Sequence, residues 1–177
     1  MLGGRHGSEP LKKKVVEWLI DEGLEVSSGD VPQGAPLEWV IKATMKAPIR
    51  VSIVVQQPKG KKDRIDMILG VAISDFHKRR LTELKPIQRA KLINALLVDL
   101  VCACPDCFIV VQPRIDNPQG VLVSRPLQGS HINRETLGEA IRVMANIYLL
   151  IVAKFNSELG SPDIGSERGS GGYYTSI

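Results

Sequence analysis

All three cysteines of this 177-residue chain stand in one short segment, CACPDC, at Cys102, Cys104 and Cys107. Thiolates bind metals and exchange electrons, so this segment is the first candidate for chemistry. A structural zinc site takes four ligands, and Asp106 or His131 would have to complete the set because no second cysteine pair exists. The residue types therefore allow a zinc site but do not favour one.

The CPDC portion also has the C-x-x-C spacing of dithiol oxidoreductases, whose reactive thiol is acidified at a helix N-terminus. Here the segment follows an expected helix, and the negative end of the helix dipole opposes a thiolate. A disulfide between Cys104 and Cys107 is a further interpretation. We favour packing, because cysteine behaves as a small apolar residue, and we predict neither a bound metal nor a cofactor.

Histidine is the other residue type that could carry catalysis, if a serine or cysteine and an orienting acid lay beside it. His6 lies in a Gly-rich N-terminal stretch, and His131 precedes the last expected helix. His77 has Lys78 and Arg79 as neighbours and is expected to be exposed. None of these settings marks a catalytic residue, and we predict that the chain is not an enzyme.

Basic residues gather in two stretches of a chain whose net charge is +4. Pro58–Arg64 (PKGKKDR) carries +3 and His77–Lys91 carries +5, which leaves −4 for the rest. The first stretch lacks the phosphate-loop pattern, so a solvated hairpin turn is the stronger interpretation. Nucleic-acid binding is kept as the alternative function, through phosphate contacts of Lys59, Lys61, Lys62, Arg64, Arg79 and Arg80. Aromatic residues make up only 5% of the chain, which offers few rings for base stacking.

Composition is that of a folded globular protein, with 44% hydrophobic and 24% charged residues. We expect residues 1–10 to form a flexible N-terminus, residues 11–158 a single α+β domain, and residues 159–177 a flexible tail rich in Gly and Ser. No run of 18 apolar residues and no secretory signal is present. We therefore expect a cytoplasmic protein without a membrane partner.

Hydrophobic periodicity predicts a first helix through Leu11, Val15 and Leu19, which ends at Gly23. The polar stretch SSGDVPQGAP (27–36) has the composition of a loop. After it, runs with a period of two predict three strands in an antiparallel meander. They are LEWVIKATM (37–45), RVSIVVQ (50–56) and RIDMILGVAI (64–73), the last being the most apolar and the expected central strand.

The second half of the chain predicts helices and one hairpin. Ser74 is expected to cap a helix, and Pro86 to begin another that runs to the cysteine segment. The segments FIVVQP and GVLVSRPL are expected to pair as a hairpin around DNPQ (116–119). Asn133 should cap a long final helix, with one apolar stripe at Leu137, Ile141, Met144, Tyr148, Ile151 and Phe155.

A second apolar set in the final helix lies about 110° around the helical wheel, at Val143, Ile147 and Leu150. A helix that is apolar on two faces has more surface than one sheet can cover. We therefore predict that these three side chains form a surface for a partner, in a homodimer or in a groove for a partner helix.

The order helix, three strands, helix, hairpin and long helix resembles the fold of type III secretion chaperones and YbjN-like proteins. The segment QQPKGKKDRIDMILGVAIS, a histidine three residues later, a basic helix and a hairpin through DNP are similar to an uncharacterised archaeal family of this kind. The resemblance covers about Leu11 to Gly160. It implies an antiparallel sheet backed by helices, in a non-enzymatic chaperone-like module that pairs with itself and binds an unidentified protein.

Overall fold

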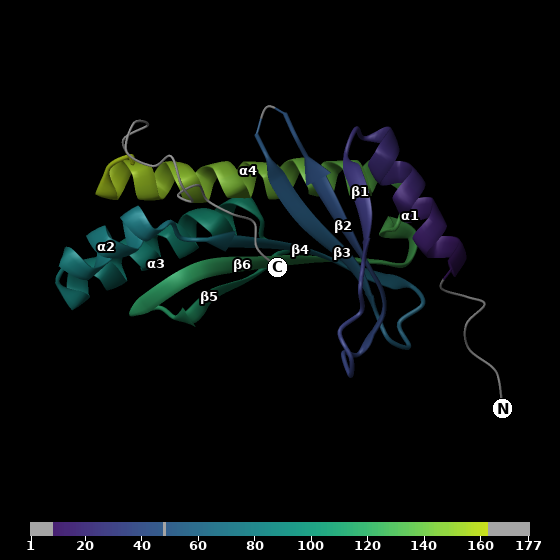
Figure 1. Ribbon diagram of the computed structural model, residues 1–177, viewed down its shortest axis with the longest axis horizontal. Helices are drawn as coiled ribbons and strands as arrows, with labels where there is room; N and C mark the ends of the chain where they lie inside the picture. The colour runs from purple at the N-terminus through teal and green to yellow at the C-terminus, as the bar shows by residue number, and fades with distance from the viewer. Residues whose placement is uncertain (1–8, 48, 163–177) are drawn as a thin grey trace. The chain divides into compact units, whose positions relative to one another are not determined.

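The computed structural model describes residues 9–47 and 49–162 (Figure 1). Most of the flexible tail expected from the sequence, and all but two residues of the expected N-terminal arm, lie outside this part of the chain. In order, the elements are α1 (Glu9–Asp21), β1 (Glu25–Gly29), β2 (Leu37–Met45), β3 (Val51–Pro58), β4 (Arg64–Ala72), α2 (Asp75–Glu83), α3 (Pro86–Ala103), β5 (Phe108–Arg114), β6 (Asn117–Gln128), η1 (Gly129–His131) and α4 (Arg134–Leu159).

The strands form one six-stranded antiparallel sheet in the order β1-β2-β3-β4-β6-β5, which confirms the predicted α+β class. The three alternating runs of the sequence are β2, β3 and β4, with Ile41 opposite Val55 and Val55 opposite Met67. The prediction that the third run is central is confirmed, because β4 lies between β3 and β6. The predicted hairpin is β5 with β6, but only Ile115 and Asp116 connect the two strands.

Strand β1 corrects the sequence prediction, which treated Ser27, Ser28 and Gly29 as part of a loop. The segment EVSSG has no apolar alternation of its own, and it becomes a strand by pairing with β2, from Glu25 opposite Thr44 to Gly29 opposite Val40. A Cβ at Gly29 would lie 2.9 Å from a methyl group of Val40, so only glycine lets the two strands approach this closely.

The helix ends follow local sequence signals. Ser74 caps α2 by accepting a hydrogen bond from the amide of His77. Asn133 caps α4 in the same way, with its Oδ1 accepting the amide of Thr136 at 3.0 Å. Pro86 is the first residue of α3, where its missing N–H removes no helical hydrogen bond. These three predictions of capping and entry residues are confirmed.

Contacts divide the described chain into two compact units. The first unit comprises the described part of residues 1–68 with 124–142, and in it α1 packs on β1 and β2. Its core contains Val15, Leu19, Trp39, Ile41, Val55 and Ile65. The second unit comprises residues 69–123 with the described part of 143–177, and its core contains Ile93, Leu96, Leu100, Ile151 and Phe155.

Helix α4 contributes residues to both units, and its predicted inner stripe is buried at every position except the half-buried Tyr148. The helix is long and apolar enough to cross a membrane by length and composition alone. Core helices pass the same test when their apolar side chains pack inside a protein. The buried stripe, which ends at Phe155, accounts for this composition as part of the core.

Candidate functional site

The predicted partner surface on α4 is corrected by the burial of its middle residue. Ile147 is fully buried, and Val143 and Leu150 are half-buried. The reason is that α4 meets helices as well as the sheet inside the second unit. Phe155 lies 5.9 Å from the ring of His77 in α2, and Lys154 binds Asp99 of α3 at 3.0 Å. The second apolar face of α4 is therefore largely covered by its own chain.

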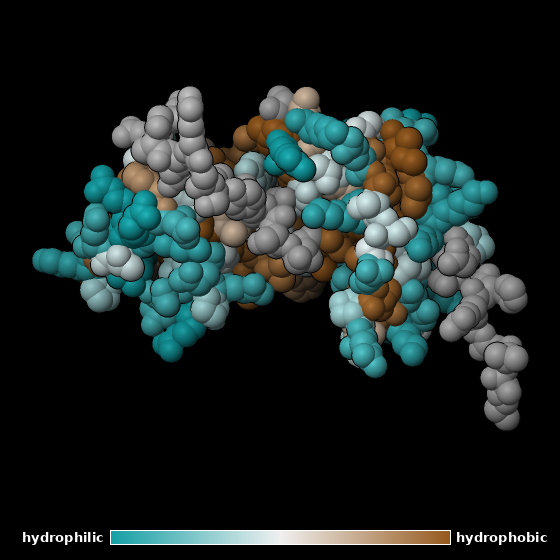
Figure 2. Space-filling model, in the orientation of Figure 1, coloured by the Kyte–Doolittle hydropathy of each residue, from teal (hydrophilic) through white to brown (hydrophobic). Residues whose placement is uncertain are grey.

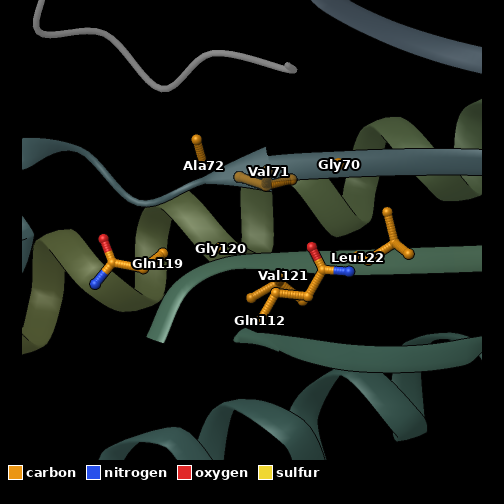
Figure 3. A pocket seen from close by; sticks show the side chains of 8 residues that line it. All are labelled: Gly70, Val71, Ala72, Gln112, Gln119, Gly120, Val121 and Leu122. Atoms are coloured by element: carbon orange, nitrogen blue, oxygen red, sulfur yellow. The ribbon is translucent and has the colours of Figure 1, made fainter. Parts of the chain in front are cut away.

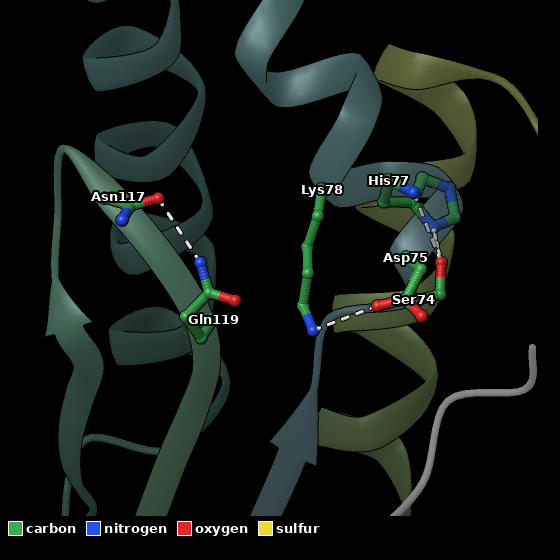
Figure 4. A network of polar contacts seen from close by, with 6 residues as sticks. All are labelled: Ser74, Asp75, His77, Lys78, Asn117 and Gln119. Atoms are coloured by element: carbon green, nitrogen blue, oxygen red, sulfur yellow. Dashed lines mark hydrogen bonds and ion pairs between the residues drawn. The ribbon is translucent and has the colours of Figure 1, made fainter.

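His77 is fully buried, so the expectation that it is exposed is wrong. Its Nε2 lies 2.9 Å from the carbonyl oxygen of Gly160, which can only accept, so Nε2 carries the proton. Nδ1 lies 2.7 Å from Oγ of Ser74 and therefore accepts the hydroxyl proton (Figure 4). The ring thus ties the start of α2 to the residue that follows α4.

The environment of His77 opposes protonation. Burial lowers the pKa of His77 below 6.5, and hydrogen bonds to the Gly160 carbonyl and the Asn156 side chain offset part of this effect. Ser74 is itself buried, and its Oγ also accepts the His77 amide. A serine and a histidine in this arrangement resemble a nucleophile and its base, but here both side chains join α2 to its surroundings.

The cysteine segment forms a covalent link at the end of α3. Cys104 and Cys107 are joined in a disulfide, which was predicted as less favoured than simple packing. Cys104 is also buried. Cys102 is exposed with a free thiol. The disulfide closes the short connection between α3 and β5. Within residues 9–47 and 49–162, no group of three or more His, Cys, Asp and Glu side chains could hold a metal ion.

The first basic stretch is an ordered loop between β3 and β4. Gln57 holds this loop in place, because its Nε2 donates to the carbonyl oxygens of Lys61 and Lys62 at 3.1 and 3.2 Å. The amide of Gly60 is already bound by the carboxylate of Glu38, which would compete with an incoming anion. The side chains of Lys59, Lys61 and Lys62 are exposed. The fourth predicted residue, Arg64, forms an ion pair with Asp66 at 2.8 Å.

The second basic stretch lies on α2 and the start of α3, in the other compact unit, and hydrophilic side chains gather over α2 in Figure 2. Much of its charge is paired locally. Arg80 binds Glu83 at 3.1 Å and lies over the ring of Phe76. Arg79 is exposed. Arg89 has a structural role, because its guanidinium donates to the carbonyl oxygens of Leu81, Leu84 and Asp116.

Several exposed large apolar side chains belong to α3 and β5, two elements that contact each other. Phe108 is 65% exposed and Val110 is 50% exposed, although both belong to a strand. Val98 and Val101 on α3 are exposed by similar fractions. Strand β5 pairs with β6 alone, so it is an edge of the sheet (Figure 1). We call Phe108, Val110 and Gln112, the alternate exposed residues of this strand, the β5 edge.

Next to the β5 edge the sheet surface has an open hollow of about 160 Å³ (Figure 3). Its lining comes from three strands of the second unit, with Gly70 and Ala72 from β4, Gly120 and Leu122 from β6, and Gln112 from β5. A Cβ at Gly120 would lie only 2.9 Å from the carbonyl oxygen of Val71. The position therefore requires glycine, and this requirement keeps the hollow open.

The β5 segment was predicted as a strand, but its position as an exposed edge was not predicted. The signal was present, because FIVVQ begins with four consecutive apolar residues, and successive side chains of a strand point to opposite faces, so both faces of this strand are apolar. What the sequence alone did not give was the strand order. That order places β5 at the end of the sheet, and Phe108 and Val110 are exposed there.

Comparison with known proteins gives a family and a fold. A family described as "Uncharacterized conserved protein (DUF2299)" matches residues 11–155. A crystal structure of an uncharacterized protein from Methanothermobacter thermautotrophicus is similar, with a TM-score of 0.74 at 16% sequence identity. The match covers 85% of this chain and 99% of that one. No curated protein matches this sequence.

Proposed function

Because the chain belongs to the DUF2299 family, whose description states no activity, we propose from its physical features that it is a non-enzymatic protein-binding module. The proposed site is the β5 edge. The partner contributes an extended segment that pairs with β5 and covers Phe108 and Val110. We also propose that the fold is a variant of the type III secretion chaperone-like fold, which the order of helices and antiparallel strands supports.

The observation that carries the proposal is a run of five residues without charge or proline, Phe108 to Gln112, at the edge of a sheet, where Pro113 and Arg114 end the strand. An edge strand leaves one row of backbone N–H and C=O groups unpaired, and proteins usually guard such edges with charges, prolines or short strands. From Phe108 to Gln112 the strand has neither a charge nor a proline. Addition of a strand gives main-chain hydrogen bonds, and exposed side chains such as Phe108 give specificity.

The proposed absence of catalysis is supported by the use of the reactive groups. Ser74 and both ring nitrogens of His77 are engaged in bonds that hold α2 in place. Cys104 and Cys107 are bonded to each other at the start of β5. These groups therefore hold elements of the second unit together. The exposed feature of this unit is the β5 edge, which follows the disulfide.

The test compares one edge variant with one matched control. Val110→Lys places a charge on the β5 edge, whereas Val31→Lys changes an exposed valine of the first unit. Each protein is immobilised and exposed to the same cell extract, and the bound proteins are quantified. The proposal predicts that binding falls with Val110→Lys alone. Equal binding by the wild type and Val110→Lys, together with unchanged self-association, would contradict it.

A second candidate function is nucleic-acid binding through the β3–β4 loop, and one observation favours it. Lys59, Lys61 and Lys62 are exposed on an ordered loop, and none of the ion pairs seen in the described chain involves them. If they contact phosphates, binding to RNA weakens steeply with salt, and the triple alanine variant lowers the salt slope by about three. Binding that is absent, or insensitive to these changes, would remove this candidate.

A further inference from the structure

We propose that the bond between Cys104 and Cys107 is a reversible redox site, opened by a dithiol, whose state sets the order of the β5 edge. This inference rests on the proposed function, because it names a regulator of the same edge. The bond joins the end of α3 to the start of β5, since Cys104 follows the last residue of the helix and Phe108 follows Cys107 directly. A change at this bond therefore acts where the proposed partner strand binds.

The helix side of the link is firmly held. Cys104 is 4% exposed, and its amide donates to the carbonyl oxygen of Leu100 at 3.0 Å. Leu100 is itself fully buried, in a helix that also buries Leu92, Ile93 and Leu96. The position of Cys104 thus follows from the packing of α3, whether or not its sulfur is bonded.

The strand side of the link is weakly held. Val111 is the one buried residue among the seven of β5, and Ile109 is half-buried. The neighbouring strand β6, by contrast, buries Val121, Val123 and Leu127. Strand β5 also pairs on one side only, with β6. Segments with few buried contacts open locally, so the covalent link to α3 is a large part of what orders the start of β5.

The small size of the disulfide loop confines the effect to this region. The two cysteines are three positions apart in the sequence. A disulfide stabilises a fold more when it closes a longer loop, so this bond contributes less to global stability than a bridge between distant segments. Opening it should therefore leave the domain folded and change the order of β5.

The turn between the cysteines keeps their sulfur atoms close when the bond is open. The amide of Cys107 donates to the carbonyl oxygen of Cys104 at 3.1 Å, which closes a four-residue turn. Pro105 is the second residue of this turn, where its fixed φ favours the turn conformation. Neither feature depends on the sulfur bond. Two thiols held in one turn react with each other at a high effective concentration, so the bond can form again.

The exposure of the two sulfur-bearing residues sets the order of the exchange steps. Cys107 is half-buried and Cys104 is buried, so a thiolate of the dithiol attacks Sγ of Cys107. A new S–S bond forms there, and Cys104 leaves as a thiolate that takes up a proton. The second thiol of the reductant then attacks the reductant sulfur of this mixed disulfide. Cys107 leaves as a thiolate and is protonated, and the dithiol becomes a cyclic disulfide.

Hydrogen exchange of the wild type before and after treatment with dithiothreitol tests the redox site. We expect the β5 amides that bond to β6 to exchange about tenfold faster after reduction, the change that corresponds to losing the order of one residue. The amides of β1 should not change, and removal of dithiothreitol in air should restore slow exchange at β5. A bond that resists excess dithiothreitol in the folded protein, or exchange at β5 that ignores its opening, would overturn the proposal.

Two variants assign the effect to this bond. Cys104→Ser with Cys107→Ser should show the fast exchange at β5 both with and without dithiothreitol. Cys102→Ser is the matched control, because it removes the exposed free thiol and leaves the bond in place. It should respond to dithiothreitol as the wild type does. A Cys102→Ser variant without this response would overturn the assignment to Cys104 and Cys107.

Capture from an extract freed of small thiols separates this inference from the proposed function. Cys104→Ser with Cys107→Ser should bind about fivefold less partner than the wild type, because a loosened strand has to be ordered on binding. If Val110→Lys binds as the wild type does, the proposed function fails, and hydrogen exchange still decides the redox site. If Val110→Lys loses binding and the double serine variant does not, the proposed function stands and redox control of the edge is overturned.

Discussion

The two edge strands of the sheet, β1 and β5, differ in length, polarity and support. Strand β1 has five residues, EVSSG, and its Glu25 forms an ion pair with Lys46. Strand β5 has seven residues, begins with FIVVQ, and follows a disulfide that fixes its start. Charge and shortness discourage strand addition, whereas an apolar edge invites it. The two edges of one sheet therefore differ in how readily each can accept a further strand.

The largest effect is expected from substitutions that give each edge strand the polarity of the other. Val110→Lys should weaken association at β5 about tenfold or more, since it puts a charge at the centre of the edge. Ser27→Val with Glu25→Val makes β1 more like β5 and should create a new tendency to associate. Capture from the cell extract measures the first change, and sedimentation velocity measures the second. Equal association of the wild type and Val110→Lys would remove the difference between the edges.

Loss of the disulfide should give the next largest effect. The bond between Cys104 and Cys107 closes a loop of four residues, which by chain entropy alone corresponds to about 2 kcal/mol. Cys104→Ser with Cys107→Ser should therefore lower the free energy of unfolding by about that amount and loosen the start of β5. Urea denaturation gives the first quantity. A variant as stable as the wild type would show that the bond does not hold the β5 edge in place.

Acidification should destabilise the second unit through His77. The pKa of this ring in the unfolded chain is near 6.5, and burial lowers it in the fold, so the unfolded state takes up the proton first. The contribution to stability is therefore complete above pH 6.5 and is lost as the pH falls through the lower pKa of the fold. Urea denaturation at pH 7.5 and 5.5 should show this loss. His77→Gln should flatten the slope, and an unchanged slope in that variant would exclude His77 as the cause.

The smallest effect is expected at the polar edge. The ion pair of Glu25 with Lys46 is largely exposed, and such pairs contribute less than about 1 kcal/mol. Lys46→Ala should thus leave the free energy of unfolding nearly unchanged. This variant serves as a control for the comparison of β1 with β5, because it removes a positive charge beside β1 and adds little apolar surface. Strong association of this variant would mean that the charge, rather than the short polar strand, protects β1.

The sequence predicted the parts of the fold that depend on neighbouring residues. Ser74 and Asn133 cap helices because their own side chains reach amides three residues later. The runs that became β2, β3 and β4 alternate within themselves. Strand β1 escaped prediction because EVSSG is a strand through its partner β2 and has no periodic signal of its own.

Burial that depends on packing between distant elements was predicted less well. Ile147 was assigned to a partner surface because a helical wheel counts apolar faces but not the layers that cover them. His77 was expected to be exposed because of its basic neighbours, although Leu81, four residues later on the same helix face, is also buried. The exposed β5 edge required the strand order, which depends on pairing between β4 and β6, 45 or more residues apart along the chain.

Hydrogen exchange at the two edge strands, measured on the free protein and on the protein bound to a partner captured from the cell extract, tests strand addition at β5 directly. If a partner strand pairs with β5, the amides from Phe108 to Gln112 exchange more slowly in the complex, while those of β1 do not change. Unchanged exchange at β5 in the complex, or equal slowing at both edges, would contradict strand addition at β5.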